Sequence, residues 1–132
     1  MTDNKEISKN IRKLILEALT LISSKEMQLS YQKKVQIADV SAELFCLWED
    51  SYCADGDIFK MGFNEEELDA LSKFNIIFEE VCDDSPDDLP IIDEVVTTAY
   101  WKKYSDTASE VLKVFPQEEV DSIKNSMMQY YS

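Results

Sequence analysis

The sequence contains no histidine, the side chain that most often acts as a general base near neutral pH. A Ser-His-Asp triad and a Cys-His nucleophile pair are therefore excluded, and a zinc site loses its commonest ligand. The chain also has no glycine-rich phosphate loop and no G-x-S-x-G turn. We expect no catalytic residues and no enzymatic activity.

Glycine and proline are scarce, with two and three residues respectively among 132. Because the polar residues are mainly Glu, Lys, Gln, Ser and Asp rather than the Gly, Thr and Asn of β-rich chains, the composition favours helices. No apolar run approaches the roughly 20 residues that a membrane span needs. The N-terminal stretch MTDNKEISKN also lacks the basic-then-apolar order of a signal peptide. We expect a cytoplasmic protein without a membrane partner.

Cysteine occurs at three positions, Cys46, Cys53 and Cys82, and these form no C-x-x-C pair. An odd number of cysteines argues against a complete set of disulfides. We therefore expect free thiols without a functional role, with Cys46 and Cys82 as small core residues.

The stretch DSYCADGD, residues 50–57, contains aspartates of the kind that bind calcium. An EF-hand loop needs acids at its first, third and fifth positions, glycine at the sixth and glutamate at the twelfth. A loop that starts at Asp55 has Phe59 at the fifth position, and one that starts at Asp50 has Tyr52 at the third. Neither register fits, so we expect no metal site and no cofactor.

A hydrophobic content of 45%, with both Trp and Phe present, is enough for one core in a chain of this length. The apolar residues from Ile7 to Ile22 recur at spacings of three and four, which is one stripe on a helix with a period of about 3.6. We predict a first helix over residues 4–23. Residues 24–40 stay open, because the serine pair at their start favours a helix whereas KKVQIADV alternates as a strand does.

The next two helices have recognisable starts. Ser41 is placed to cap a helix that ends near Cys53. In FNEEELDAL, Asn64 and Glu67 have the spacing of a capping box, which predicts a helix that runs to about Cys82. We expect the aromatic residues on these and later stripes to lie in the core: Trp48, Phe74, Phe78 and Phe115.

Pro90 suits the first turn of another helix. The β-branched run at residues 95–98 predicts a break or a capping threonine. A helical stripe then extends to Phe115, and Pro116 opens the last helix. Together these patterns predict an all-α fold, a compact bundle of five to six helices in a single domain over residues 1–132.

Acidic residues are concentrated in the middle of the chain. The first 42 residues carry a net charge of +2, residues 43–95 carry −15 and the last 37 carry −1. In EEVCDDSPDDLPIIDE, residues 79–94, half of the positions are acidic and none is basic. Solubility does not require this concentration, because a net charge of about 2 to 8 is ample for a small domain, and self-repulsion opposes folding.

Two interpretations of this acidity stay open, a solvated surface and a docking face for a basic protein. We expect the partner-binding residues of such a face to be Asp50, Tyr52, Asp55, Asp57, Asp83, Asp84, Asp87 and Asp88. Among them, Tyr52 is the candidate interface anchor. We further expect the polar loops that follow two helices to lie at one end of the bundle. Nucleic acid is not an expected ligand, because the middle segment repels phosphates.

Three segments, AELFCLWEDSY, GFNEEELDALSKFNIIFEEV and DDLPIIDEVVTTAYWKKYSDTASEVLKVF, resemble a family of small, acidic, helical bacterial proteins. The family is associated with immunity to secreted or contact-delivered toxins. The likeness covers about residues 42–115. It is carried by Glu43, Leu44, Trp48, Glu49, Asp50, Phe63, Glu67, Leu71, Phe74, Phe78, Leu89, Pro90 and Trp101. Most of these positions are expected to be core or cap positions.

The resemblance implies an acidic immunity or inhibitor protein that neutralises a cognate bacterial toxin by occluding a basic active-site surface. The expected partner is a basic toxin domain, with nucleases among the candidates. Two alternatives stay open: a non-catalytic helical assembly or regulatory module, homodimers included, and a nucleic-acid mimic whose carboxylates imitate phosphates. Affinity that falls steeply with salt favours the charged docking face, because exposed charges are screened within about 8 Å at physiological ionic strength.

Overall fold

The computed structural model describes residues 3–131, and every regular element in that range is a helix. The eight helices are α1 (Asn4–Ser23), α2 (Lys25–Lys34), α3 (Val40–Ser51), α4 (Asp57–Met61), α5 (Glu65–Asp84), α6 (Ile92–Val95), α7 (Ala99–Leu112) and α8 (Gln117–Tyr131). The all-α prediction is confirmed, but the predicted number of five to six helices is wrong. The excess comes from short elements such as α4, whose five residues are too few to show a helical period. Within the described range, no helix combines the length and apolarity needed to cross a bilayer.

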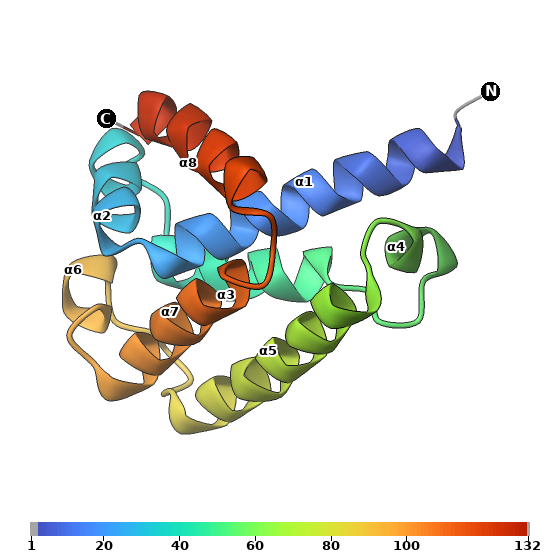
Figure 1. Ribbon diagram of the computed structural model, residues 1–132. Coiled ribbons are helices and arrows are strands. Elements are labelled where there is room, and N and C mark those ends of the chain that lie inside the picture. The colour runs from blue at the N-terminus through green and yellow to red at the C-terminus, as the bar shows by residue number, and fades with distance from the viewer. Residues whose placement is uncertain (1–2, 132) are drawn as a thin grey trace.

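Helix α1 is the centre of the bundle: it packs against α3, α4, α7 and α8, and α7 in turn packs against α5. Figure 1 shows α1 crossing the molecule, with α8 on one side and α7 and α5 on the other. The C-terminal half of α1 carries buried residues that include Ile15, Leu19 and Ile22, whereas most of its first half is exposed. The first helix predicted over residues 4–23 is confirmed, and Asp3 caps it.

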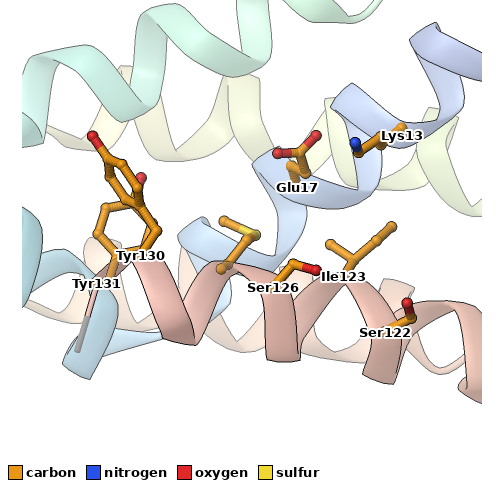
Figure 2. A pocket seen from close by; sticks show the side chains of 8 residues that line it. Lys13, Glu17, Ser122, Ile123, Ser126, Tyr130 and Tyr131 are labelled. Atoms are coloured by element: carbon orange, nitrogen blue, oxygen red, sulfur yellow. The ribbon is translucent and has the colours of Figure 1, made fainter.

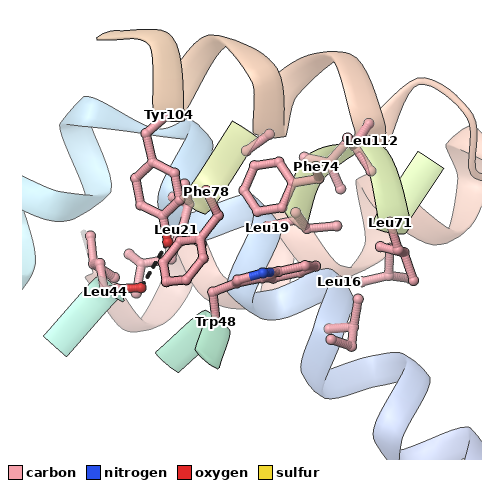
Figure 3. Packing of buried hydrophobic residues seen from close by; sticks show 14 of the residues in the cluster. Leu16, Leu19, Leu21, Leu44, Trp48, Leu71, Phe74, Phe78, Tyr104 and Leu112 are labelled. Carbon is pink, nitrogen blue, oxygen red and sulfur yellow. Dashed lines mark hydrogen bonds between the residues drawn. The ribbon is translucent and has the colours of Figure 1, made fainter. Parts of the chain in front are cut away.

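The core is built around aromatic residues of α3, α5 and α7 (Figure 3). Trp48 meets Phe74 edge to face with ring centroids 4.5 Å apart, and Phe74 stacks on Tyr104 at 5.7 Å. The buried Tyr104 hydroxyl donates a hydrogen bond to the Leu44 carbonyl at 2.9 Å. The aromatic residues that we expected in the core are all buried: Trp48, Phe74, Phe78 and Phe115. These contacts fix the position of α3 relative to α5 and α7.

Residues 24–40, for which the sequence left helix and strand open, form α2 followed by a turn. Ser24 caps α2 by accepting a hydrogen bond from the Met27 backbone N–H at 3.2 Å. The buried Gln28 accepts a hydrogen bond from the Trp101 indole at 3.0 Å, and its amide donates to two carbonyls at the end of α1. Capping and one satisfied buried amide therefore hold this segment as a helix.

The start of α3 differs from the prediction. The N-cap is Asp39, which accepts a hydrogen bond from the Ala42 N–H at 3.3 Å, and not Ser41. Ser41 is buried and donates to the Pro90 carbonyl at 2.8 Å. Pro90 is not in the first turn of a helix either, because α6 begins at Ile92. The serine that resembled a cap instead joins α3 to the segment before α6.

Helix α5 begins as predicted and ends later than predicted. Asn64 and Glu67 form the expected capping box, with hydrogen bonds of 2.8 and 2.9 Å. The helix continues to Asp84 rather than ending near Cys82. Asp83 therefore projects from the last turn of a helix, which decides the neighbours of its carboxylate.

All three cysteines are free, but their predicted burial is wrong for Cys46. Cys46 is exposed, and Cys82 is only half-buried. On α3, the buried residues Leu44 and Trp48 lie two positions before and after Cys46. Two positions correspond to about 200° around a helix, so Cys46 faces away from the core.

A cluster of charged residues around Arg12 joins α1, α5 and α8. The guanidinium donates to the two Glu67 carboxylate oxygens at 2.7 and 2.8 Å, and to those of Glu119 at 2.7 and 2.9 Å. It also donates to the Gly62 carbonyl at 2.9 Å. The hydrogen bonds to Glu67 and Glu119 raise the pKa of Arg12. Burial alone would raise the pKa of Glu67, but hydrogen bonds from Arg12 and the Asn64 backbone hold it below its usual value.

Candidate partner-binding site

Helix α3 and the middle of α5 face each other across large aromatic side chains. Trp48 contacts Phe74, and Phe45 meets Phe78 edge to face with ring centroids 5.8 Å apart. The Trp48 indole donates to the Asn75 side-chain carbonyl at 3.1 Å. These side chains fix the spacing of the two helices, and a surface hollow lies beside them.

We call this hollow the acidic groove. It is lined by Glu49, Tyr52, Ala54, Asn75, Phe78, Glu79, Cys82 and Asp83, and has a volume of about 520 Å³. Three of these residues are carboxylates and none is basic. The groove brings Tyr52 and Asp83, two of the expected partner-binding residues, together from separate parts of the chain.

Cys82 lies in the acidic groove together with the three carboxylates. Burial raises the pKa of the Cys82 thiol first, and the negative charges of Glu49, Asp83 and Glu79 raise it further. A thiol held in its protonated form at neutral pH is a poor nucleophile and a poor metal ligand. The acidic groove therefore has a negative electrostatic field and no activated cysteine.

Tyr52 forms a fixed aromatic wall of the acidic groove. Its ring stacks on Trp48 with centroids 5.0 Å apart and an interplanar angle of 13°, and its edge meets Phe59 at 5.5 Å. Burial raises the pKa of Tyr52, and a hydrogen bond with the Ser72 side chain partly offsets this. The role of Tyr52 as an interface anchor stays a prediction, since part of its ring is already packed on the core.

A second hollow lies on the other side of the same chain segment, between α1, the end of α3 and α4. It is lined by Ile11, Leu14, Asp50, Ser51, Cys53, Gly56, Asp57, Ile58 and Phe59, and we call it the apolar groove. The carboxylates that line it are Asp50 and Asp57, both of which we expected to bind a partner. The segment over residues 49–54 thus separates the two grooves and contributes side chains to each.

The remaining expected residues are exposed and lie in neither groove. Asp55 is in the turn before α4, Asp84 is the last residue of α5, and Asp87 and Asp88 follow it. The expectation that the two polar loops meet at one end of the bundle is wrong (Figure 1).

The reason is the antiparallel pairing of α3 with α5. The C-terminal end of α3 lies beside the first half of α5, where Tyr52 contacts Ser72, whereas Phe45 contacts the later residue Phe78. Asp84 lies twelve positions after Ser72, which is about 18 Å along the helix. The acidic surface is therefore elongated along α5, and of the later aspartates Asp83 is the one that shares a groove with Tyr52.

The carboxylates of this surface have few cationic neighbours within the described chain, although Asp84 adds to the effect of Glu80 in raising the pKa of Lys103. Over residues 3–131, the seven expected aspartates make no ion pair, and neither do Glu49 and Glu79. Elsewhere, several acids are paired, for example Glu67 with Arg12 and Glu80 with Lys103. Most other acids of the described chain are also without an ion pair, so this surface is distinguished by the three carboxylates that line one groove.

A third hollow, between α1 and α8, differs in its charge (Figure 2). Its α1 side carries one base, Lys13, and one acid, Glu17. The α8 side supplies serine hydroxyls and the rings of Tyr130 and Tyr131. None of the expected partner-binding residues lies there, and its charges balance. Among the described residues, no group of three or more Cys, Asp or Glu side chains is arranged to hold a metal ion.

Two local spacings in the sequence indicate the walls of the acidic groove. Glu79, Cys82 and Asp83 are spaced i, i+3 and i+4 on one helix, so they share a face, and Glu49 stands three residues before Tyr52. No family model, no curated protein and no solved structure matches this chain. The functional argument therefore depends on the chemistry of the surface itself.

Proposed function

We propose that the protein is a non-catalytic inhibitor that binds a basic protein partner over the surface formed by α3, α4 and α5. The observation that carries this proposal is the convergence of Glu49, Glu79 and Asp83 in one groove without a cationic partner from the described chain. Like charges that lie close together repel one another, so their convergence lowers the free energy of unfolding and destabilises the fold. A cationic partner relieves that repulsion when it binds.

Electrostatic complementarity of this kind acts mainly on the rate of association. Long-range attraction between surfaces of opposite charge raises the association rate constant by orders of magnitude at low salt. The exposed pairs formed in the complex contribute less, typically below about 1 kcal/mol each. An inhibitor that must capture its target quickly benefits from the rate more than from the affinity.

The proposed partner is a bacterial toxin domain whose basic active-site surface is occluded. Support comes from the resemblance to toxin-immunity proteins, which includes Glu49 and Asp50, one residue from each groove. Enzymes that act on nucleic acids have basic clefts that bind phosphates, and such a cleft matches an acidic groove with aromatic walls. The absence of histidine from the chain agrees with inhibition by binding rather than by catalysis.

The test compares two triple variants that change the net charge equally. The groove variant is Glu49→Lys, Glu79→Lys and Asp83→Lys, and the control variant is Asp106→Lys, Glu110→Lys and Asp121→Lys, all exposed residues of α7 and α8. The partner is first isolated by affinity capture with the parent protein, and its association with each variant is then measured by stopped-flow fluorescence at low and high salt.

We expect the groove variant to associate at least about tenfold more slowly at low salt, and the control variant to stay within about threefold of the parent. The difference should shrink at high salt, because screening removes the long-range attraction. Equal association rates for the two variants would refute the proposal. Circular dichroism must show that both variants retain the helical fold.

A further inference from the structure

The apolar groove is lined by more apolar side chains than a surface that only faces water needs. Its floor is the buried ring of Phe59, and Ile11 and Ile58 form half-buried walls. Leu14 is 57% exposed at its edge, although α1 has polar residues at other exposed positions. Gly56 contributes no side chain that would fill the hollow. Several apolar groups thus surround a space in which the chain places nothing of its own.

The charge around the apolar groove restricts what fills it. Asp50 and Asp57 line it, and the acidic groove lies across the segment over residues 49–54. A second copy of this chain is a poor occupant, because each copy carries a net charge of −14 and the two would repel one another. A complementary occupant has an apolar side chain that enters the groove and cationic side chains next to it.

We infer that the apolar groove receives an aliphatic side chain from a basic segment of the partner, with flanking lysines or arginines facing Asp50 and Asp57. This inference rests on the proposed function and assigns the two grooves different roles. The acidic groove attracts the partner, and the apolar groove holds it after contact. Buried apolar anchors act mainly on the dissociation rate, whereas exposed charges act mainly on association.

The first probes are three synthetic helical peptides of equal length. One has Leu along one face and Lys at the positions that flank this face, the second replaces each Leu with Ser, and the third replaces each Lys with Glu. Amide chemical shifts of the full-length protein locate the binding site, and isothermal titration calorimetry gives the affinity. We expect the Leu/Lys peptide to shift the amides of Leu14, Gly56 and Ile58, and to bind about 10- to 100-fold more tightly than the Ser/Lys peptide. The Leu/Glu peptide should not bind.

Two matched variants separate the apolar contact from the charge. Leu14→Glu alters the apolar groove, while Ile76→Glu makes the same change at a residue of α5 that is 55% exposed and lies in neither groove. Both variants add one negative charge, which by itself favours a cationic peptide. We expect Leu14→Glu to weaken binding of the Leu/Lys peptide at least tenfold, and Ile76→Glu to leave it unchanged or slightly tighter.

Equal affinity of the Leu14→Glu and Ile76→Glu variants would overturn the inference, as would shifts confined to the acidic groove. With the isolated partner, Leu14→Glu should raise the dissociation rate and leave the association rate within about threefold of the parent. The triple lysine variant of the acidic groove tests the proposed function with Leu14 intact. The two hypotheses therefore fail in different variants and in different rate constants.

Discussion

Carboxylates serve opposite purposes in two regions of this molecule. In the Arg12 cluster, Glu67 is buried and accepts two hydrogen bonds from one guanidinium, whose remaining donors bind Glu119 and Gly62. In the acidic groove, three carboxylates surround a thiol and have no cation to pair with in the described chain. The first arrangement joins helices, and the second leaves charge at the surface.

The two regions differ in whether their carboxylates lose their hydration when the protein folds. A buried carboxylate loses its hydration, and charge-assisted hydrogen bonds must compensate for that loss. An exposed carboxylate keeps its water, so it can stay unpaired at little cost apart from repulsion. Substitutions in the Arg12 cluster should therefore change stability, whereas substitutions in the acidic surface should change binding.

Removal of the Arg12 guanidinium should have the largest effect on stability. Arg12→Ala leaves the buried Glu67 carboxylate without its cation, and we expect the free energy of unfolding to fall by about 3–5 kcal/mol. Urea denaturation followed by circular dichroism measures the change. The control is Lys13→Ala, because Lys13 makes no ion pair within the described chain, and it should cost less than about 0.5 kcal/mol. Similar losses of unfolding free energy in both variants would contradict a specific stabilising role of the Arg12 cluster, and with it the contrast between the two regions.

Gly62→Ala should destabilise the protein by a smaller amount, about 1–3 kcal/mol, through steric overlap beside the same cluster. A Cβ atom at Gly62 would lie 2.8 Å from the backbone carbonyl oxygen of Ser8 on α1. The backbone of Gly62 has an ordinary φ of −82°, so the cost is one of space and not of conformation.

Gly56→Ala provides the comparison for Gly62→Ala. There the nearest atom to the added Cβ is the Cys53 sulfur, at 3.0 Å, and this side chain can rotate away. Thermal unfolding should therefore show a smaller loss for Gly56→Ala. A larger loss at Gly56 than at Gly62 would mean that the contact between α1 and Gly62 is not tight.

Acid should weaken the Arg12 cluster. The pKa of Glu67 in the folded protein is lowered from its usual value of 4.5, so its contribution to stability is complete above that pH. The contribution is lost as the pH falls through the lowered folded value, because the unfolded chain takes up the proton more readily. Unfolding free energies of the parent and Arg12→Ala should therefore converge as the pH falls from about 5 to 3. A constant difference over this range would contradict the assigned role of Glu67.

Reversal of the later aspartates should have the smallest effect on stability. Asp83→Lys, Asp84→Lys, Asp87→Lys and Asp88→Lys replace exposed residues without ion pairs, so the fold should persist, with a change of at most about 0.5 kcal/mol per site. If they face the partner, the change should slow association and abolish protection of cells that express the matching toxin.

A variant that reverses only Asp84, Asp87 and Asp88 sharpens this test. These three residues lie outside the acidic groove, whereas Asp83 lines it. A full effect from the triple variant would extend the binding surface to the end of α5. Binding of the quadruple variant that is as fast and as tight as that of the parent would exclude all four residues from the interface.

Local patterns predicted most of the helices, because a helical stripe or cap depends on residues within a few positions of each other. The first helix and the capping box of Asn64 and Glu67 are examples. The predicted capping role of Ser41 is wrong for the opposite reason. Its hydroxyl donates a hydrogen bond to the carbonyl of Pro90, 49 residues away, and no local pattern contains that contact. The Arg12 cluster was missed in the same way, since its partners lie 55 and 107 residues further along.

The sequence by itself determined that the chain is helical, that its acidity is concentrated in residues 43–95, and that no histidine is present for catalysis. Only the tertiary structure decided which carboxylates are buried beside Arg12 and which converge around Cys82. It also placed Tyr52 in one groove with Asp83, whereas Asp84, Asp87 and Asp88 lie outside that groove. The reason is that helix formation is governed by nearest neighbours along the chain, whereas the environment of a charge is set by helices that pack across tens of residues.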